Sequence, residues 1–351
     1  MAQTNGGRNE HRTPIVVVMC SDDTYVRPTA VTITSVLHNL APGYTVELYL
    51  VDRGISQAHR NRVEHVLAVY ADRVTLHWRF VDTSGLDAIA PSESWLNSNA
   101  YVPLWMETIV PASVNKALYL DSDLVVEGSL SDLWNRELHS AALLAAQDQW
   151  IPHISSHAGI HNHTVIDASD THPYFNSGVM VCNLEKWRAA HVNERARAYI
   201  RRHTHAINLA DQGVLNAVLM HDWKALPPSW NVHHKIGTKR WIREAAQWPL
   251  SDFRTEMRAR YSTLLSYPHI LHFAGPEKPW KTDHHPEALR WFRYAWRSRW
   301  MTLRERARSI PTVYQRQSVG TIKNATRPIR HWVARRVPAP LTRVLAPYTD
   351  E

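Results

Sequence analysis

The stretch Pro14-Ile-Val-Val-Val-Met-Cys20, followed by the polar loop Ser21-Asp-Asp-Thr-Tyr25, decides the predicted fold. An unbroken run of apolar, largely β-branched residues is typical of a strand buried on both faces of a parallel sheet. Pro28 suits the first turn of a helix. The apolar residues after it recur at helical spacing, at Ile33, Val36, Leu37 and Leu40. This part of the chain therefore predicts a strand, a loop and a helix in succession.

The same alternation continues through residue 80. A second strand is predicted over residues 46–52, a helix capped by Ser56 follows it, and alternating apolar residues predict a third strand over 74–80. Strand-helix-strand-helix-strand is the signature of a doubly wound α/β sheet. Ligands of such sheets bind beyond the carboxyl ends of the strands, which is where the loop 21–25 is expected to lie.

Two common nucleotide-binding fingerprints are missing from the chain. No G-x-G-x-x-G follows the first strand, and no G-x-x-x-x-G-K-[ST] occurs anywhere. A dinucleotide oxidoreductase and a P-loop NTPase are both disfavoured by these absences. Any nucleotide is expected to contact the acidic loop 21–25 instead.

Cysteine content and apolar runs indicate the cellular compartment. The two cysteines, Cys20 and Cys182, lie in apolar runs and are expected to pack in the core, which excludes a disulfide scaffold and a zinc site built from cysteines. Apolar runs fall far short of the ~20 residues that a membrane helix needs. The N-terminal residues show no secretory signal pattern. A cytoplasmic protein with a soluble body is therefore expected.

The net charge of +8 is concentrated at the C-terminal end. Residues 281–351 contain 15 Lys and Arg against 5 Asp and Glu, so this segment carries +10 and residues 1–280 carry −2. A body with that charge offers no continuous basic groove, which argues against nucleic acid as a partner. The expected organisation is a disordered N-terminus over 1–13, one large α/β catalytic domain over 14–280, and a basic, Trp- and Arg-rich appendage over 281–351.

The segment Lys116-Ala-Leu-Tyr-Leu-Asp121-Ser-Asp123 leads an apolar strand into two carboxylates. Side chains at i and i+2 share one face if the strand geometry persists. Two convergent carboxylates suit a hard divalent cation such as Mg²⁺ or Mn²⁺, which can offset the charge of a diphosphate leaving group. A polar turn after a strand is the alternative for such a pair taken alone.

Three further segments extend this pattern. They are Tyr174-Phe-Asn176-Ser-Gly178-Val-Met-Val-Cys-Asn183-Leu-Glu-Lys-Trp187, Asp211-Gln212-Gly-Val-Leu-Asn216 and His272-Phe-Ala-Gly275-Pro-Glu-Lys278-Pro-Trp280. With these segments in this order, the chain resembles the family 8 glycosyltransferases, which include bacterial lipopolysaccharide α-galactosyltransferases and glycogenin. The resemblance runs from about Ile15 to Trp280. It implies a nucleotide-diphospho-sugar transferase fold of the Rossmann-like GT-A type.

The resemblance also implies an activity and a set of site residues. The activity is retaining transfer of a hexose, with glucose or galactose favoured, from a UDP-sugar to an acceptor hydroxyl, with Mn²⁺ (or Mg²⁺) as cofactor. The implied residues are Asp121, Asp123 and His272 for the metal, Asp22, Thr24 and Tyr25 for uridine, Gly275 and Lys278 for the diphosphate, and Asn176, Asp211 and Gln212 around the donor sugar. The residue chemistry agrees, since an imidazole beside two carboxylates suits Mn²⁺ and a lysine suits phosphate.

The chain departs from the family pattern at three positions. Pro103 stands where family members usually carry an arginine that contacts donor sugar or phosphate, and proline can supply neither charge nor a donor. Gly213 replaces an aspartate after Asp211-Gln212, and Thr24 replaces a common asparagine. These departures leave the donor hexose open. They also leave a second function open, a catalytically degenerate UDP-sugar-binding protein docked at a membrane.

A histidine series after residue 152 allows two interpretations. His153, His157, His161 and His163 include the i, i+4 spacing of zinc ligands on a helix. Pro152, two serines and Gly159 within the series favour a loop instead. In the resembled family this region covers the acceptor side, so we expect a lid loop that contacts the acceptor.

The segment Arg290–Trp300 interleaves arginines with aromatic residues. One interpretation is an interfacial helix that binds an anionic membrane surface, as cationic faces with Trp and Phe do. The alternative is that the aromatics pack back onto the body and only the later arginines are free. Both keep the enzyme at the inner face of a membrane, which suits a glycolipid or cell-envelope glycan acceptor.

Overall fold

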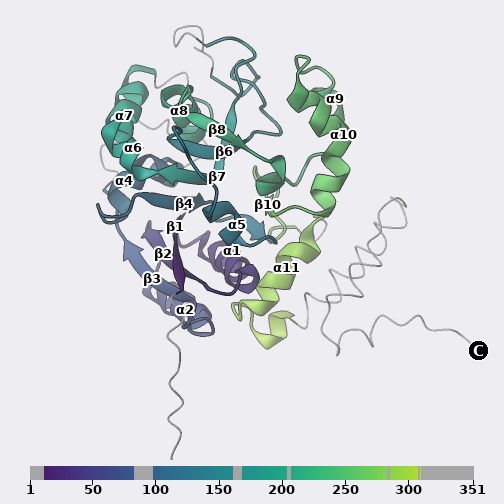
Figure 1. Ribbon diagram of the computed structural model, residues 1–351. Helices are drawn as coiled ribbons and strands as arrows, with labels where there is room; N and C mark the ends of the chain where they lie inside the picture. The colour runs from purple at the N-terminus through teal and green to yellow at the C-terminus, as the bar shows by residue number, and fades with distance from the viewer. Residues whose placement is uncertain are drawn as a thin grey trace, which may run out of the picture.

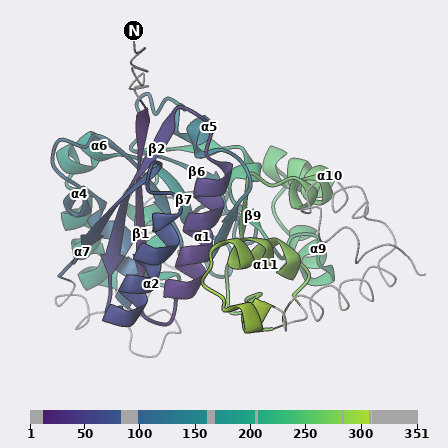
Figure 2. The same ribbon diagram turned by 90° about the horizontal axis from the view of Figure 1, so that it is seen from below.

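The computed structural model describes residues 12–82, 98–160, 168–203, 207–282, 285–306 and 309. At its centre lies a seven-stranded sheet in the order β3-β2-β1-β4-β7-β6-β8, with helices on both faces (Figures 1 and 2). Its strands are β1 (Thr13–Ser21), β2 (Tyr44–Asp52), β3 (Val74–Arg79), β4 (Lys116–Leu120), β6 (Leu143–Gln147), β7 (Phe175–Asn183) and β8 (Trp223–Leu226). The predicted α/β fold is thus confirmed.

The first half of the sheet follows the sequence prediction closely. β1 pairs in parallel with β2 along its full length, and β2 pairs in parallel with β3. The helices α1 (Val26–Asn39) and α2 (Gln57–Ala68) connect these strands, and the Ser56 side chain accepts a hydrogen bond from the His59 backbone at the start of α2. Such a cap satisfies a donor that the first helical turn would otherwise leave unpaired.

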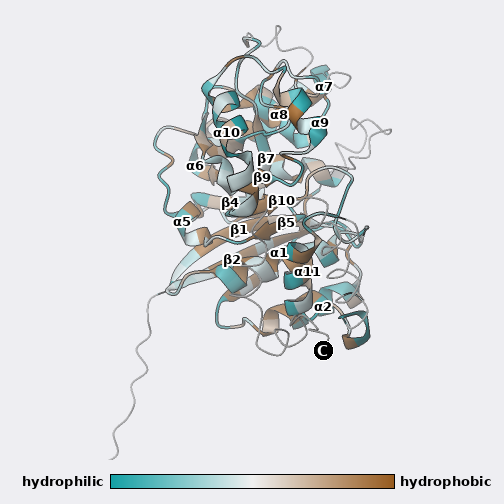
Figure 3. Ribbon diagram, turned by 90° about the vertical axis from the view of Figure 1, so that its right-hand side faces the viewer, coloured by the Kyte–Doolittle hydropathy of each residue, from teal (hydrophilic) through white to brown (hydrophobic). Residues whose placement is uncertain are grey.

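The apolar run in β1 is explained by burial on both faces of the sheet. Val17 packs in a cluster with α1 and α2, whereas Val16 and Val18 pack in a second cluster with the helices of the opposite face. Figure 3 shows the hydrophobic residues gathered in the central strands, including β1 and β5 (Leu124–Val126). Cys182 and Cys20 pack in the second cluster, and burial raises the pKa of both thiols, as expected for core cysteines.

One strand of the large sheet runs against the others. β7 is antiparallel to β4 and to β6, so the sheet is mixed. The start of β7 therefore lies at the same sheet edge as the ends of β1 and β4. The contact that marks this edge is a hydrogen bond of 2.9 Å from the Asp121 backbone N–H to the Gly178 carbonyl.

A second sheet of three strands adjoins this edge. It consists of β5, β10 (Ile270–His272) and β9 (Val232–His233), with β10 antiparallel to β5 and parallel to β9. The chain leaves the large sheet at the end of β4 and enters the small one at Leu124. Asp121 and Asp123 therefore lie at the junction of the two sheets.

The remaining helices surround these sheets. They are η1 (Ser98–Trp105), α4 (Met106–Ile109), α5 (Leu130–Trp134), α6 (Leu184–Ala189), α7 (Val192–His203), α8 (Ala210–Val218), η4 (Pro228–Trp230), α9 (Lys239–Ala245), α10 (Asp252–Ser266) and α11 (Ala288–Arg297). Within the described part of the chain, no helix is long and apolar enough to cross a bilayer.

The helix α11 belongs to the body, which corrects the membrane interpretation of Arg290–Trp300. Trp291 is fully buried and Phe292 nearly so, in one cluster with residues of β5 and β10, and the helix packs beside α1 (Figure 2). Arg290, the first arginine of the expected interfacial helix, forms ion pairs with Glu127 at 2.8 Å and Glu287 at 3.1 Å. The small sheet needs this cover because its outer face is apolar.

The core thus continues past the boundary expected at residue 280. Trp300 and Met301 are also buried. The expected disordered N-terminus lies, except for residues 12 and 13, outside the described residues, as do the later arginines of the appendage from 310 onwards.

We predict that Trp291→Ala lowers the free energy of unfolding by about 3–5 kcal/mol, because it removes a fully buried indole from a packed core. Leu303→Ala is the control in the same segment, since that side chain is 83% exposed and should change stability by less than about 0.5 kcal/mol. Urea unfolding measures both. Equal stability of the two variants would show that α11 is not part of the cooperative fold.

Candidate active site

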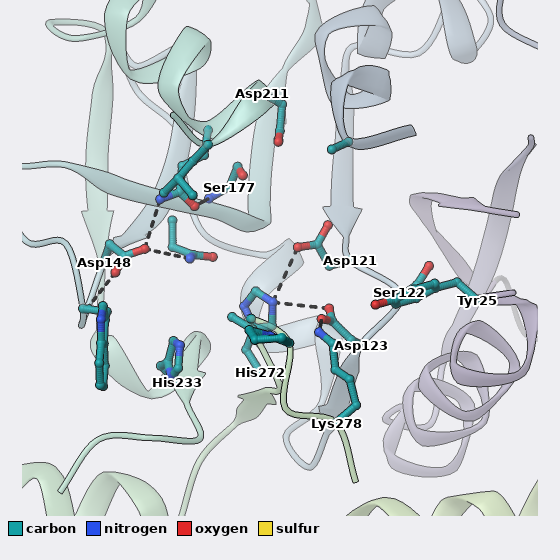
Figure 4. A pocket seen from close by; sticks show the side chains of 18 of the residues that line it. Tyr25, Asp121, Ser122, Asp123, Asp148, Ser177, Asp211, His233, His272 and Lys278 are labelled. Atoms are coloured by element: carbon teal, nitrogen blue, oxygen red, sulfur yellow. Dashed lines mark hydrogen bonds and ion pairs between the residues drawn. The ribbon is translucent and has the colours of Figure 1, made fainter. Parts of the chain in front are cut away.

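Three chain segments bring two carboxylates and an imidazole together. Asp121 follows β4, Asp123 precedes β5 and His272 ends β10. The His272 Nε2 atom lies 3.5 Å from Asp121 Oδ2 and 3.3 Å from Asp123 Oδ1 (Figure 4). Among the described residues, this is the one group of three potential metal ligands whose atoms lie within 4.8 Å of one another.

The pairing of the small sheet explains how these residues meet. β10 pairs with β5 so that His272 is opposite Leu124, the residue after Asp123. The Phe273 backbone N–H donates to the Asp123 carbonyl at 3.0 Å, which extends this pairing beyond the strands. On the other side, the Tyr119 hydroxyl donates to Asp121 Oδ1 at 3.0 Å. Backbone pairing and one tyrosine thus position all three side chains.

Gly178 leaves the space in which these ligands lie. A Cβ atom at this position would be 2.4 Å from His272 Cε1 and 2.6 Å from Asp121 Oδ2, closer than real Cβ atoms approach. Two carboxylates and an imidazole that meet in this way are a possible ligand set for a divalent cation. The residues therefore fit a divalent cation, and which ion binds stays a prediction.

The charges in this cluster are unevenly compensated. Lys278 Nζ contacts Asp123 Oδ2 and donates to the Phe273 carbonyl at 2.6 Å. Burial alone would raise the pKa of Asp123, but Lys278 and His272 outweigh it and lower that pKa. Burial and the charge of Asp123 together raise the pKa of Asp121. For His272, burial is outweighed by the two carboxylates, so its pKa is raised.

The cluster lies in the wall of a cavity of about 560 Å³. That volume is within the range of small-molecule sites in proteins. The sequence-predicted residues that line it are Asp22, Tyr25, Asp121, Asp123, Asn176, Asp211, Gln212, His272, Gly275 and Lys278. Thr24 is the exception. It is exposed, and its backbone N–H donates to Asp22 Oδ1 at 2.9 Å, because it lies within the turn after β1.

The loop after β1 is held rigidly. Asp22 Oδ1 accepts from the backbone of Thr24 and Tyr25, and its Oδ2 accepts from Asn99 Nδ2 at 2.9 Å. Asn99 lies in the first turn of η1, and its Oδ1 accepts a hydrogen bond from Arg53. These hydrogen bonds hold the expected ligand loop in a turn against η1.

Asp148 is a site residue that the sequence analysis missed. Its Oδ2 accepts hydrogen bonds from Asn176 Nδ2 at 2.8 Å and Gln212 Nε2 at 3.1 Å. The signal was present, because β6 is an apolar strand that runs directly into this aspartate, as β4 runs into Asp121. Asp211 is also buried, and burial followed by the charge of Asp121 raises its pKa well above the usual range.

An aromatic and cationic part of the wall was also missed. Trp150 stacks on His233 with ring centroids 5.4 Å apart, and the Arg240 guanidinium lies 5.6 Å from the Trp150 centroid. Lys235 lines the same side and pairs with Glu277 at 3.0 Å. No spacing rule in the sequence connects these residues, because they meet only through the loop between β9 and α9.

Pro103 does not reach the cavity. It is buried inside η1, whose contributions to the wall are Asn99 and Ala100. The proline therefore does not leave a gap in the cavity wall at the position where the family has its arginine. Among the described lining residues, Lys235, Arg240 and Lys278 supply the Lys and Arg cations.

The histidine series forms a loop over residues 153–160, as expected. His153 is buried and His157 is exposed, and no group of metal ligands includes either of them within the described chain. His161 and His163 lie outside the described residues. The role of this loop as a lid remains a prediction.

Comparison with known proteins gives the family. The "General stress protein A" of Bacillus subtilis is 29% identical over 293 residues, which cover 82% of this chain and 95% of that protein. The "Lipopolysaccharide 1,2-glucosyltransferase" of Escherichia coli K12 is 23% identical over 74% of this chain and 70% of its own length. The solved structure of the galactosyltransferase LgtC has a TM-score of 0.68 at 22% identity, and it covers 84% of this chain and 99% of that one.

The LgtC likeness confirms the fold of the GT-A type that the sequence predicted. The family model described as "Glycosyl transferase family 8" matches residues 16–284, which include every predicted site residue. With a glycosyltransferase fold and a match over most of its length, this chain belongs to glycosyl transferase family 8.

Proposed function

We propose that this glycosyltransferase is a retaining enzyme that moves a hexose, with glucose or galactose favoured, from a UDP-sugar to a hydroxyl of an acceptor glycan. The observation that carries the proposal is the convergence of Asp121, Asp123, His272 and Lys278 on one cavity wall. A divalent cation held by these residues, together with Lys278, would supply the positive charge that a diphosphate leaving group requires. Similarity to a lipopolysaccharide glucosyltransferase and to a galactosyltransferase supports a hexose donor.

The donor diphosphate would bind beside this cluster. A bound Mn²⁺ or Mg²⁺ would stabilise the negative charge of the departing UDP as a Lewis acid. Asp121, Asp123 and His272 would hold the cation, and Lys278 would direct its charge to a phosphate oxygen. Gly275, at φ 84°, adopts a backbone conformation that favours glycine and leaves its backbone open to the diphosphate.

The nucleoside and the sugar would lie on opposite sides of the diphosphate. Asp22 and Tyr25 would contact uridine, and Thr24 would contribute through the turn that it forms with Asp22. Asn176 and Asp211 would orient the hydroxyl groups of the donor sugar. These roles follow the family resemblance, position by position.

Retention is best explained by attack on the front face of the donor sugar. Gln212 is the side chain that the resemblance places at the anomeric carbon, but an amide is a poor nucleophile. Both ends of this amide are also engaged, since Oε1 accepts from the Ser177 backbone and Nε2 donates to Asp148. We infer that the bond from the anomeric carbon to the phosphate oxygen breaks while the acceptor oxygen bonds from the same side. The acceptor proton passes to the leaving phosphate.

The second candidate function is a catalytically degenerate UDP-sugar-binding protein docked at a membrane. Proline at position 103 favours it, because the arginine of the family is missing there. Repeated release of UDP in the presence of an acceptor glycan would identify the enzyme. A single stoichiometric binding event without release would identify the binding protein.

For the metal, we predict that Asp121→Asn abolishes Mn²⁺ binding and UDP-sugar turnover and leaves the fold intact. EDTA should stop turnover by the unmodified protein, and added Mn²⁺ should restore it. UDP release from UDP-glucose and UDP-galactose is the measurement. Asp132→Asn, an exposed aspartate on α5, is the control and should change nothing. Full activity in EDTA would contradict the proposal.

For the space between the ligands, we predict that Gly178→Ala weakens Mn²⁺ binding by more than about tenfold, because the new methyl group would occupy the position against His272 and Asp121. The matched control is Gly213→Ala on α8, where the nearest atom to the new Cβ is Tyr174 Oη at 3.8 Å. That control should bind Mn²⁺ normally. Titration with Mn²⁺ and thermal unfolding distinguish lost binding from lost folding.

The acceptor is proposed to be a glycolipid or cell-envelope glycan, reached from the inner face of a membrane. The basic residues beyond 309 would attach the protein peripherally: Arg316, Lys323, Arg327, Arg330, Arg335, Arg336 and Arg343. Each cation near an anionic leaflet contributes about 1 kcal/mol. Half of them would suffice for attachment.

We predict that the full-length protein floats with anionic vesicles at low salt and is released by high salt. A chain ending at Ser309 should not float, because three of the four aromatic residues of α11, Trp291, Phe292 and Tyr294, are buried in the body. Neutral vesicles are the control. If the full-length protein ignores anionic vesicles, or if its binding ignores salt, the membrane proposal is wrong and a soluble acceptor is the better choice.

A further inference from the structure

A continuous series of hydrogen bonds leads from His272 to the sugar side of the cavity. His272 Nδ1 lies 2.9 Å from Asn231 Oδ1, and Asn231 Nδ2 donates to Asn176 Oδ1 at 2.8 Å. Asn176 Nδ2 then donates to Asp148 Oδ2 at 2.8 Å. The same oxygen of Asp148 also accepts a hydrogen bond from Gln212 Nε2 at 3.1 Å (Figure 4). Asn231 and His272 are buried, at 4% exposure each.

Two groups whose role as donor or acceptor is known, the Asp148 carboxylate and the Gly178 N–H, determine the direction of every hydrogen bond in this series. Asp148 Oδ2 accepts from the amide nitrogens of Gln212 and Asn176, so the Asn176 side chain turns its NH2 group toward Asp148. The Gly178 backbone N–H donates to Asn176 Oδ1 at 3.0 Å, which independently places the oxygen of that amide. Asn231 must then direct its NH2 group to Asn176 and its oxygen to His272.

The oxygen of Asn231 therefore faces the imidazole and can only accept. This requires the proton on His272 Nδ1, which in the neutral ring leaves Nε2 with its lone pair. Nε2 is the atom that faces Asp121 and Asp123. Without Asn231, the two carboxylates would favour the opposite tautomer, with the proton on Nε2, because it could donate to them.

We propose that Asn231 is a positioning residue that fixes the tautomer and the ring orientation of His272 so that Nε2 can bind a divalent cation. The inference rests on the proposed function, since it concerns the metal site of the transferase. Asp148 accepts a hydrogen bond from the NH2 group of Asn176, and this fixes the orientation of the Asn176 amide. The Asn176 amide in turn fixes the orientation of the Asn231 amide. The side chains that face the donor sugar and the ligand of the metal thus belong to one polar network.

The test compares three variants of the full chain. Asn231→Ala removes the acceptor and should weaken Mn²⁺ binding by about 10- to 100-fold, as loss of a second partner of a metal-binding histidine does. Asn231→Asp keeps an acceptor opposite Nδ1 and should retain most of the Mn²⁺ affinity. Asn216→Ala is the control, because Asn216 is also buried and bonds the backbones of Phe175 and Gln212, but does not reach His272.

Mn²⁺ affinity is measured by the electron paramagnetic resonance signal of the free ion, and stability by urea unfolding. The proposal predicts that both alanine variants lose stability and that only Asn231→Ala loses Mn²⁺ affinity. Equal Mn²⁺ affinity of the two alanine variants, or an aspartate variant as weak as Asn231→Ala, would overturn it.

A second measurement separates this inference from the proposed function. Long-range ¹H–¹⁵N spectra of the metal-free protein report the tautomer of His272, assigned by comparison with His272→Gln. The neutral ring should carry its proton on Nδ1 in the unmodified protein and on Nε2 in Asn231→Ala. A proton on Nε2 in the unmodified protein would overturn the inference. Failure of the unmodified protein to bind Mn²⁺, with the Nδ1 tautomer present, would refute the proposed function alone.

Discussion

The burial of several carboxylates in one cavity is the constraint on which the site depends. Asp211 is buried, Asp123 is nearly buried and Asp121 is half-buried in the cavity wall, where charges interact more strongly than in water. Lys278 and His272 compensate Asp123, whereas the pKa values of Asp121 and Asp211 are raised by burial and neighbouring negative charge. A site with more acidic groups than cations favours a cationic ligand.

The alternating elements of the first 80 residues could be predicted because their signals are local. The apolar run of β1 and the stripe of α1 each report burial directly through their spacing. The direction of β7 could not be predicted, since it is determined by pairing with β4 and β6 rather than by its own residues. For α11 the sequence indicated an amphipathic helix, but only the apolar outer face of the β5–β10 pair shows what its aromatic side covers.

The candidate site was predictable to a similar extent. Asp121, Asp123 and His272 occur in segments with a characteristic order, so their meeting was expected before any geometry was known. Asn231 and Trp150 carry no such pattern. Their importance lies in the partner that each side chain touches. Such contacts depend on how β9 and the residue before it lie against β7 and the turn after β6. Thr24 illustrates the opposite error, because a residue adjacent to two lining residues can still face the solvent in a tight turn.

The junction between the two sheets has a consequence for the lifetime of the fold. Asp121 directly follows β4 of the large sheet, and His272 is the last residue of β10 in the small sheet. A cation held by both residues would therefore cross-link the two sheets. A ligand that binds only the folded state at 100 times its dissociation constant adds about 2.7 kcal/mol to the free energy of unfolding. The concentration of free divalent ion in the cell would then control how much intact protein is present, in addition to how fast each molecule works.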